Sequence, residues 1–239
     1  MSHPGCKSGL MNKNLTSITY ILDRSGSMAS LTKAAISGFN TFVKEQMDTP
    51  GDATLTLVLF DDEYEVPYKA IPIQHIEKLT TRIYTTRGCT ALLDAIGKTI
   101  TDLEKQIAEQ PEEMRPGNVI ISIFTDGYEN ASEKYTNKSI NKLIKAKTEK
   151  DGWTFLFLAA NQDAIATASA MNIGMHNSSS VVNDAFGMSS QWAANSRKIS
   201  SIRMKKMGYA DESGDFDKPM SEIIDEEMRD QAGDEKSSK

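Results

Sequence analysis

Strand-like apolar runs alternate with amphipathic helical runs along most of the chain, and this alternation predicts an α/β fold. Residues 55–60 and 153–158 are nearly continuous apolar runs, which is typical of strands covered on both faces of a parallel sheet. We therefore expect a three-layer, Rossmann-like fold with a mainly parallel six-stranded sheet and helices on both faces. The strands are predicted near residues 16–22, 54–60, 64–71, 118–125, 153–159 and 180–183.

The third predicted strand differs from the others. It contains Pro67, which cannot donate a hydrogen bond to a neighbouring strand, and only residues 61–63 separate it from the strand before it. Residues 64–71 should therefore form an antiparallel edge strand in a hairpin. Between the strands, apolar residues recur at spacings of three and four, which predicts helices near 28–42, 92–107, 138–149, 163–172 and 186–205.

The chain of 239 residues is expected to hold one domain, at residues 15–207, with a short segment on either side. Residues 1–14 are polar and without periodicity, and they are predicted to form a flexible leader. Residues 208–239 contain 11 acidic and 4 basic residues and few apolar ones. Such a composition does not offset the entropy cost of ordering, so this acidic tail is predicted to be disordered.

Composition excludes several classes of function. The body of the chain, residues 1–207, has 23 basic and 22 acidic residues, so it lacks the clustered positive charge that nucleic acid requires. No run of about 20 apolar residues is present, and the polar N-terminus is not an export signal. Cys6 and Cys89 lie far apart, without the spacing of a zinc site. A cytoplasmic protein with reduced thiols is expected, with neither a membrane nor a nucleic acid as partner.

Three segments carry oxygen donors to the ends of predicted elements. Asp23, Ser25 and Ser27 lie in a tight turn after the first strand, Thr90 comes just before the second predicted helix, and Asp126 follows the fourth strand. In a parallel sheet these strand ends share one edge, where ligands gather at the point of strand-order reversal. Carboxylate and hydroxyl oxygens suit Mg²⁺ or Mn²⁺ and are poor ligands for softer metals. The pattern predicts an open site for a hard cation.

Helix capping is the simpler interpretation of each piece taken alone. Ser25 and Ser27 are residue types that satisfy free N–H groups at a helix start, and Thr90 is a plausible cap of its own helix. The joint occurrence of the three segments in this order favours the metal site over three separate caps.

With these residues the chain resembles a von Willebrand factor type A domain over about residues 15–205. The metal-ion-dependent adhesion site of that family has the pattern D-x-S-x-S, then T, then D, which Asp23, Ser25, Ser27, Thr90 and Asp126 match. The surrounding segments Asp-Arg-Ser-Gly-Ser-Met, Thr-Ala-Leu-Leu-Asp-Ala-Ile and Thr-Asp-Gly are similar to those of bacterial and phage-type intracellular members.

The resemblance implies that the two serines and the threonine touch the ion directly, while the two aspartates often act through water. It also implies that an Asp or Glu of a partner protein fills the remaining coordination position. Many intracellular relatives work beside AAA+ ATPases, so such an ATPase is an implied partner. Where relatives often have Gly-Gly-Thr, this chain has Gly88-Cys89-Thr90. The Cys89 side chain is expected to restrict the loop, and its thiol is expected to be buried.

These patterns favour a divalent-metal-dependent protein-binding module, of the adhesion or scaffold type, and not an enzyme. The main alternative is a Mg²⁺-dependent phosphoester hydrolase that uses the same cleft. That alternative lacks an evident general base, because His3 lies in the leader and His75 and His176 flank remote segments.

Two acidic segments leave further alternatives open. Asp61, Asp62 and Glu63 could supply a carboxylate at the rim of the cleft, although turn chemistry favours a solvated hairpin turn. Acidic residues of the tail, such as Asp211 and Asp215, could also enter the metal site of the same or a neighbouring molecule.

Overall fold

A computed structural model describes residues 12–126, 128–160, 164–180 and 184–237. Its six strands form one sheet in the order β3-β2-β1-β4-β5-β6. The strands are β1 (Asn12–Asp23), β2 (Asp52–Phe60), β3 (Tyr64–Pro72), β4 (Pro116–Thr125), β5 (Thr154–Ala159) and β6 (Ser178–Ser180). The helices are α1 (Thr32–Asp48), α2 (Leu92–Ala108), α3 (Asn137–Asp151), α4 (Ala164–Ala170), α5 (Ala185–Lys206) and α6 (Met220–Ser237).

The sheet is parallel except at one edge, where β3 pairs antiparallel with β2. This arrangement confirms the predicted edge strand and the predicted Rossmann-like fold. The strand order reverses between β1 and β4, which are direct neighbours although about 100 residues separate them. A crevice at the carboxyl ends of these two strands is therefore the expected place for a ligand.

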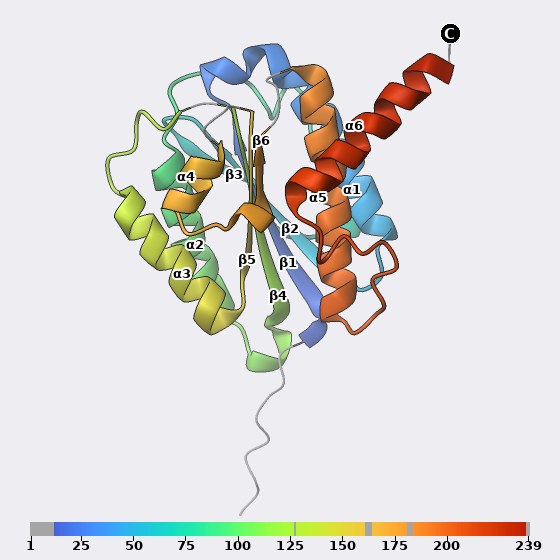
Figure 1. The fold of residues 1–239 in the computed structure, drawn as a ribbon. Coiled ribbons are helices and arrows are strands. Elements are labelled where there is room, and N and C mark those ends of the chain that lie inside the picture. The colour runs from blue at the N-terminus through green and yellow to red at the C-terminus, as the bar shows by residue number, and fades with distance from the viewer. Residues whose placement is uncertain (1–11, 127, 161–163, 181–183, 238–239) are drawn as a thin grey trace, which may run out of the picture.

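Helices cover both faces of the sheet (Figure 1). The face with α1, α5 and the first turns of α6 has one apolar core, and the face with α2, α3 and α4 has a second. On the first face the Trp192 ring stacks on Tyr20 at 4.9 Å and on Phe124 at 5.2 Å between centroids. The apolar residues of α5, Met188, Trp192, Ile199 and Ile202, thus belong to the core.

The prediction of a disordered C-terminal tail is wrong for most of the segment. Residues 220–237 form helix α6, and Met220, Ile223 and Ile224 are at most 2% exposed in the core shared with α1 and α5. The prediction used the average composition of the tail and so overlooked three apolar residues that lie on one face of a helix. Burial of these three side chains offsets the entropy cost of ordering the segment. The acidic composition of the whole tail had suggested that this cost would keep it disordered.

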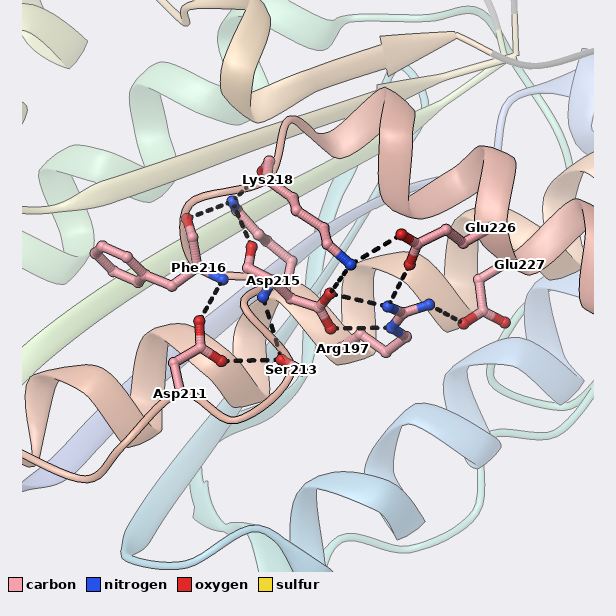
Figure 2. A network of polar contacts seen from close by, with 9 residues as sticks. Arg197, Asp211, Ser213, Asp215, Phe216, Lys218, Glu226 and Glu227 are labelled. Carbon is pink, nitrogen blue, oxygen red and sulfur yellow. Dashed lines mark hydrogen bonds and ion pairs between the residues drawn. The ribbon is translucent and has the colours of Figure 1, made fainter.

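Charge pairing also holds the C-terminal segment against α5 (Figure 2). Arg197 donates two hydrogen bonds to the Asp215 carboxylate, at 2.8 and 3.0 Å, and one each to Glu226 and Glu227. The ammonium of the buried Lys198 donates to three backbone carbonyls of residues 215–218, at 2.6 to 2.9 Å. Adjacent cations on α5 therefore bind the acidic segment, and its negative charge is a means of attachment.

The remaining differences from prediction are small. The last strand, β6, covers residues 178–180 and not 180–183, and residues 181–183 lie outside the described residues. Of the predicted leader, residues 12–14 belong to β1, and residues 1–11 lie outside the described residues. None of the helices in the described parts of the chain has both the length and the apolarity needed to cross a bilayer.

Replacing Ile223 by alanine tests whether α6 contributes to the core. The Ile223→Ala change should lower the free energy of unfolding by about 2 to 4 kcal/mol, because it leaves a cavity between α6 and α5. Chemical denaturation monitored by circular dichroism measures the effect. Asp225→Ala, at an exposed position of the same helix, should change it by less than about 0.5 kcal/mol. Equal stabilities of the two variants would contradict the docking of α6.

Candidate metal centre

Neighbouring parallel strands bring the two predicted aspartates to one edge of the sheet. Strand β1 ends at Asp23, β4 ends at Thr125, and Leu22 lies opposite Phe124 in the register between them. Asp126 follows directly after β4. The Asp23 side chain is fully buried and Asp126 is 6% exposed, so both carboxyl groups lie below the surface of this edge.

Hydrogen bonds connect the two serines to both aspartates. Asp23 Oδ1 accepts from the Ser25 amide at 2.6 Å. The Ser25 and Ser27 hydroxyl oxygens lie 3.0 Å apart, and the Ser27 hydroxyl donates to Asp126 Oδ1 at 2.7 Å. Four of the five predicted site residues are thus connected by hydrogen bonds, through the Ser25 amide and the two serine hydroxyls.

Thr90, the fifth predicted residue, lies in a loop that packs against the Asp23 turn. The Gly26 amide donates to the Gly88 carbonyl at 3.2 Å, and the Arg87 amide donates to the Arg24 carbonyl at 2.8 Å. Thr90 itself is 3% exposed, and its amide donates to Asn130 Oδ1 at 2.9 Å. The backbone contacts therefore bring the threonine loop beside the serine turn.

Burial determines the electrostatics of Asp23. Desolvation raises the pKa of this carboxyl to about 6, although hydrogen bonds from Thr125 and Ser25 lower it. The nearby charge of Asp126 also raises the pKa. A cation bound between the two carboxylates would relieve their repulsion.

The donor set is of the kind that a hard divalent cation prefers. Asp23 and Asp126 offer carboxylate oxygens, and the two serine hydroxyl oxygens, 3.0 Å apart, are hydrogen-bonded to each other. Across the described residues, no three Asp, Glu, His or Cys side chains gather in a way that could hold a metal ion. A metal at this edge would therefore have only two carboxylates and would depend on the hydroxyl oxygens.

Helix capping does not account for these hydroxyls. Ser25 is the N-cap residue of a short 3₁₀ helix, Gly26–Leu31, but its side chain makes no capping hydrogen bond. The N-cap position of α2 is occupied by Ala91 and not by Thr90. Thus neither Ser25 nor Thr90 has the capping role that the simpler interpretation assigned to it.

A loop that the sequence reasoning missed caps α2 instead. Glu129 Oε2 accepts from the Leu93 amide at 2.9 Å, and Ser132 Oγ accepts from the Asp94 amide at 3.0 Å. In return Asp94 accepts hydrogen bonds from three amides of residues 133–135. Burial opposes ionisation of Asp94, but these three bonds prevail and lower its pKa. The loop after Asp126 is therefore fixed to the helix after Thr90.

An ion-pair cluster, also missed, fixes the hairpin turn to the site. Asp61 is fully buried and lies 3.2 Å from Arg24 Nε and 2.8 Å from Arg87 Nε. Glu63 and Glu65 pair with the same two arginines. The expected solvated turn is thus wrong for Asp61. The signal in the sequence was Arg24, between Asp23 and Ser25, because a buried cation there needs an acidic partner from another segment.

The prediction of a buried thiol at Cys89 is also wrong. Cys89 is exposed, and its amide donates to Asp62 Oδ1 at 3.2 Å. Gly88 has a positive φ of 66°, and a Cβ at this position would lie 1.8 Å from the same Asp62 oxygen. The contact between the loop and the hairpin thus requires glycine at position 88.

Acidic residues of the C-terminal segment are already engaged, away from the start of α5. Asp211 accepts from the Phe216 amide at 2.8 Å, and Asp215 binds Arg197. Helix α5 begins at the end of the sheet where β1 and β4 finish and runs away from it (Figure 1). Within one molecule, Asp211 and Asp215 therefore lie remote from the candidate site.

Comparison with solved structures identifies the fold. The chain is similar to a von Willebrand factor type A protein from Catenulispora acidiphila (TM-score 0.53, 16% identity, 83% of this chain and 43% of the other). It is also similar to the ArnB paralog VWA2 from Sulfolobus acidocaldarius (0.51, 18%, 78% and 46%) and to the manganese-loaded TRAP protein of Plasmodium vivax (0.50, 11%, 72% and 70%). No protein-family model and no curated protein matches the sequence.

This chain therefore has the fold of a von Willebrand factor type A domain. It spans less than half the length of the first two structures. At such low identities the likeness concerns the fold alone.

Removing the Asp61 charge tests the ion-pair cluster. Asp61→Asn should lower the free energy of unfolding by about 3 to 5 kcal/mol, because it leaves the buried Arg24 guanidinium without its buried partner. Glu63→Gln, in an exposed side chain of the same cluster, should cost less than about 1 kcal/mol. Urea denaturation of both variants gives the comparison, and similar losses would show that burial of Asp61 does not matter.

Substitution of Gly88 tests the loop contact. Gly88→Ala should destabilise the protein by about 1 to 3 kcal/mol, because alanine at a positive φ is strained and its Cβ meets Asp62. Gly26→Ala is the matched control, since a Cβ there has its nearest neighbour at 3.5 Å. Thermal unfolding of the two variants measures the difference. A tolerated Gly88→Ala would mean that the loop does not need this backbone conformation.

Proposed function

We propose that the protein is a divalent-metal-dependent protein-binding module whose metal site recognises an acidic residue of a partner protein. The observation that carries this proposal is the chain of contacts from Asp23 through Ser25 and Ser27 to Asp126, at the strand-order reversal of the sheet. The manganese-loaded state of one structural neighbour, TRAP, is consistent with it.

The five residues would share the work of holding Mg²⁺ or Mn²⁺. Ser25, Ser27 and Thr90 offer neutral hydroxyl oxygens, while Asp23 and Asp126 supply the negative charge. When bound, the ion supplies a positive field that neutral ligands leave largely uncompensated, and this field attracts an anionic ligand from outside. A carboxylate of a partner protein fits that position, and an AAA+ ATPase is one partner class that the family resemblance implies.

Metal binding is the first step to test. Isothermal titration with MnCl₂ should give one site in the wild-type chain, and Asp126→Ala should weaken binding at least tenfold by removing a carboxylate. Asp225→Ala, which removes an equal charge from exposed α6, is the control and should bind as the wild type does. Equal affinity of the Asp126→Ala variant would contradict the site.

Partner binding is the second step. Proteins captured on the immobilised wild-type chain with MgCl₂ should be released by EDTA and should be absent from an Asp23→Ala column. Ser30→Ala, at an exposed serine near the turn, should capture them normally. Capture that survives both EDTA and Asp23→Ala would exclude a metal-bridged contact. Mg²⁺-dependent hydrolysis of a phosphoester, lost in Asp126→Ala, would favour the hydrolase alternative.

A further inference from the structure

The Asp23 carboxylate is held by protein donors at both of its oxygens. Oδ1 accepts from the Ser25 amide at 2.6 Å, and Oδ2 accepts from the hydroxyl of Thr125, the last residue of β4, at 2.5 Å. The terminal torsion of an aspartate is broad, so a carboxylate held at one oxygen alone can still rotate. Donors at both oxygens fix the plane of the Asp23 carboxylate, and further lone pairs remain on each oxygen for a cation or its water.

Strand pairing brings the Thr125 hydroxyl to this place. Leu22 of β1 lies opposite Phe124 of β4, so Asp23 and Thr125 are the next residues of the two parallel strands. Thr125 is 1% exposed, and its carbonyl accepts from the Ala160 amide at 3.0 Å, which ties the end of β4 to the segment after β5. Because a β-branched side chain has few χ1 rotamers, the direction of this hydroxyl is set together with the backbone.

A second hydroxyl holds the backbone of the same aspartate. The Tyr84 hydroxyl donates to the Asp23 carbonyl at 2.6 Å, and the tyrosine is fully buried in the core on the α1 and α5 face. Tyr84 belongs to the segment between β3 and α2, which also carries Thr90. Asn40 of α1 holds an earlier part of this segment through two hydrogen bonds with the Leu79 backbone, at 2.8 and 3.0 Å. Tyr84 therefore joins the threonine loop to the end of β1.

Both contacts act on Asp23, although neither hydroxyl belongs to the five candidate ligands. Thr125 holds the carboxylate, and Tyr84 holds the carbonyl. Mg²⁺ demands near-ideal octahedral geometry, so a site with a freely turning carboxylate binds it less tightly. Residues that orient metal ligands typically change metal affinity roughly 10- to 100-fold when they are replaced.

We propose that Thr125 and Tyr84 are positioning residues of the metal centre, which hold the Asp23 carboxylate and the Asp23 backbone in the arrangement that binds the cation. Thr125 sets the rotation of the carboxylate, and Tyr84 keeps the threonine loop against the serine turn. Both act through Asp23 and do not touch the ion. This role rests on the proposed function, because it concerns the same ion.

Isothermal titration of the full chain with MnCl₂ tests the role of Thr125. Thr125→Val keeps the shape of the side chain and removes the hydroxyl, so it should weaken Mn²⁺ binding roughly tenfold. Thr125→Ser restores a hydroxyl and should recover most of the affinity. Thr16→Val is the matched control, because Thr16 is also a buried threonine of the sheet but lies towards the other end of β1, about 23 Å from Asp23. It should bind Mn²⁺ as the wild type does.

Tyr84→Phe tests the second contact and serves as the further variant if Thr125→Val does not fold by circular dichroism. It should weaken Mn²⁺ binding about fivefold, as expected for the loss of one neutral hydrogen bond, whereas Tyr20→Phe should leave the affinity unchanged. Tyr20 is equally buried in the same core, but its hydroxyl contacts Asn195 of α5. Urea denaturation should show similar losses of stability in both variants, so a difference in affinity reports the positioning of Asp23.

A measurement without metal separates the positioning role from metal binding itself. In EDTA, hydrogen exchange followed by NMR should show the Ser25 amide exchanging roughly fivefold faster in Thr125→Val than in the wild type, because its acceptor carboxylate is then free to rotate. Thr125→Ser should restore slow exchange.

Each failure has a different meaning. Unchanged Mn²⁺ affinity in folded Thr125→Val or Tyr84→Phe would overturn the role of that residue and leave the metal site standing. Unchanged exchange of the Ser25 amide in Thr125→Val would overturn the role of Thr125 as well. Absence of Mn²⁺ binding to the wild-type chain would overturn the proposed function and the positioning role together.

Discussion

The buried carboxylate of Asp61 is the contact on which the candidate site depends. It pairs with Arg24, which follows Asp23 in the serine turn, and with Arg87, which precedes the glycine of the threonine loop. Three segments that are distant in sequence therefore meet at one anion. Because Arg24 is nearly as deeply buried as Asp61, water does not weaken this attraction as it would on the surface. The candidate metal ligands are thus positioned by charged residues that lie outside the candidate set.

A second set of contacts fixes the opposite wall of the site. The loop after Asp126 caps helix α2 through Glu129 and Ser132, and Asp94 of α2 binds the amides of the same loop. One wall of the site is thus held by ion pairs and the other by hydrogen bonds to backbone amides, and both restrict where the oxygen donors lie. Preorganisation of this kind matters most for a cation with strict octahedral geometry, because distorted ligand positions are penalised.

Sequence patterns were sufficient for the fold and for the placement of Asp23 and Asp126 at one edge of the sheet. Parallel strands must end at one edge, so the two aspartates could be brought together from periodicity and strand order alone. The supporting shell could not be predicted, since the pairing of Asp61 with Arg24 and the capping by Glu129 depend on which loops meet in three dimensions. Helix α6 was missed because its acidic average masked an apolar face that only becomes evident beside α5.

Helix α5 joins the core of the domain to the C-terminal segment. Its inner face buries Trp192 against the sheet, and its basic residues hold the C-terminal segment. An acidic composition that by itself favours disorder therefore becomes a means of attachment, because α5 presents cations to it.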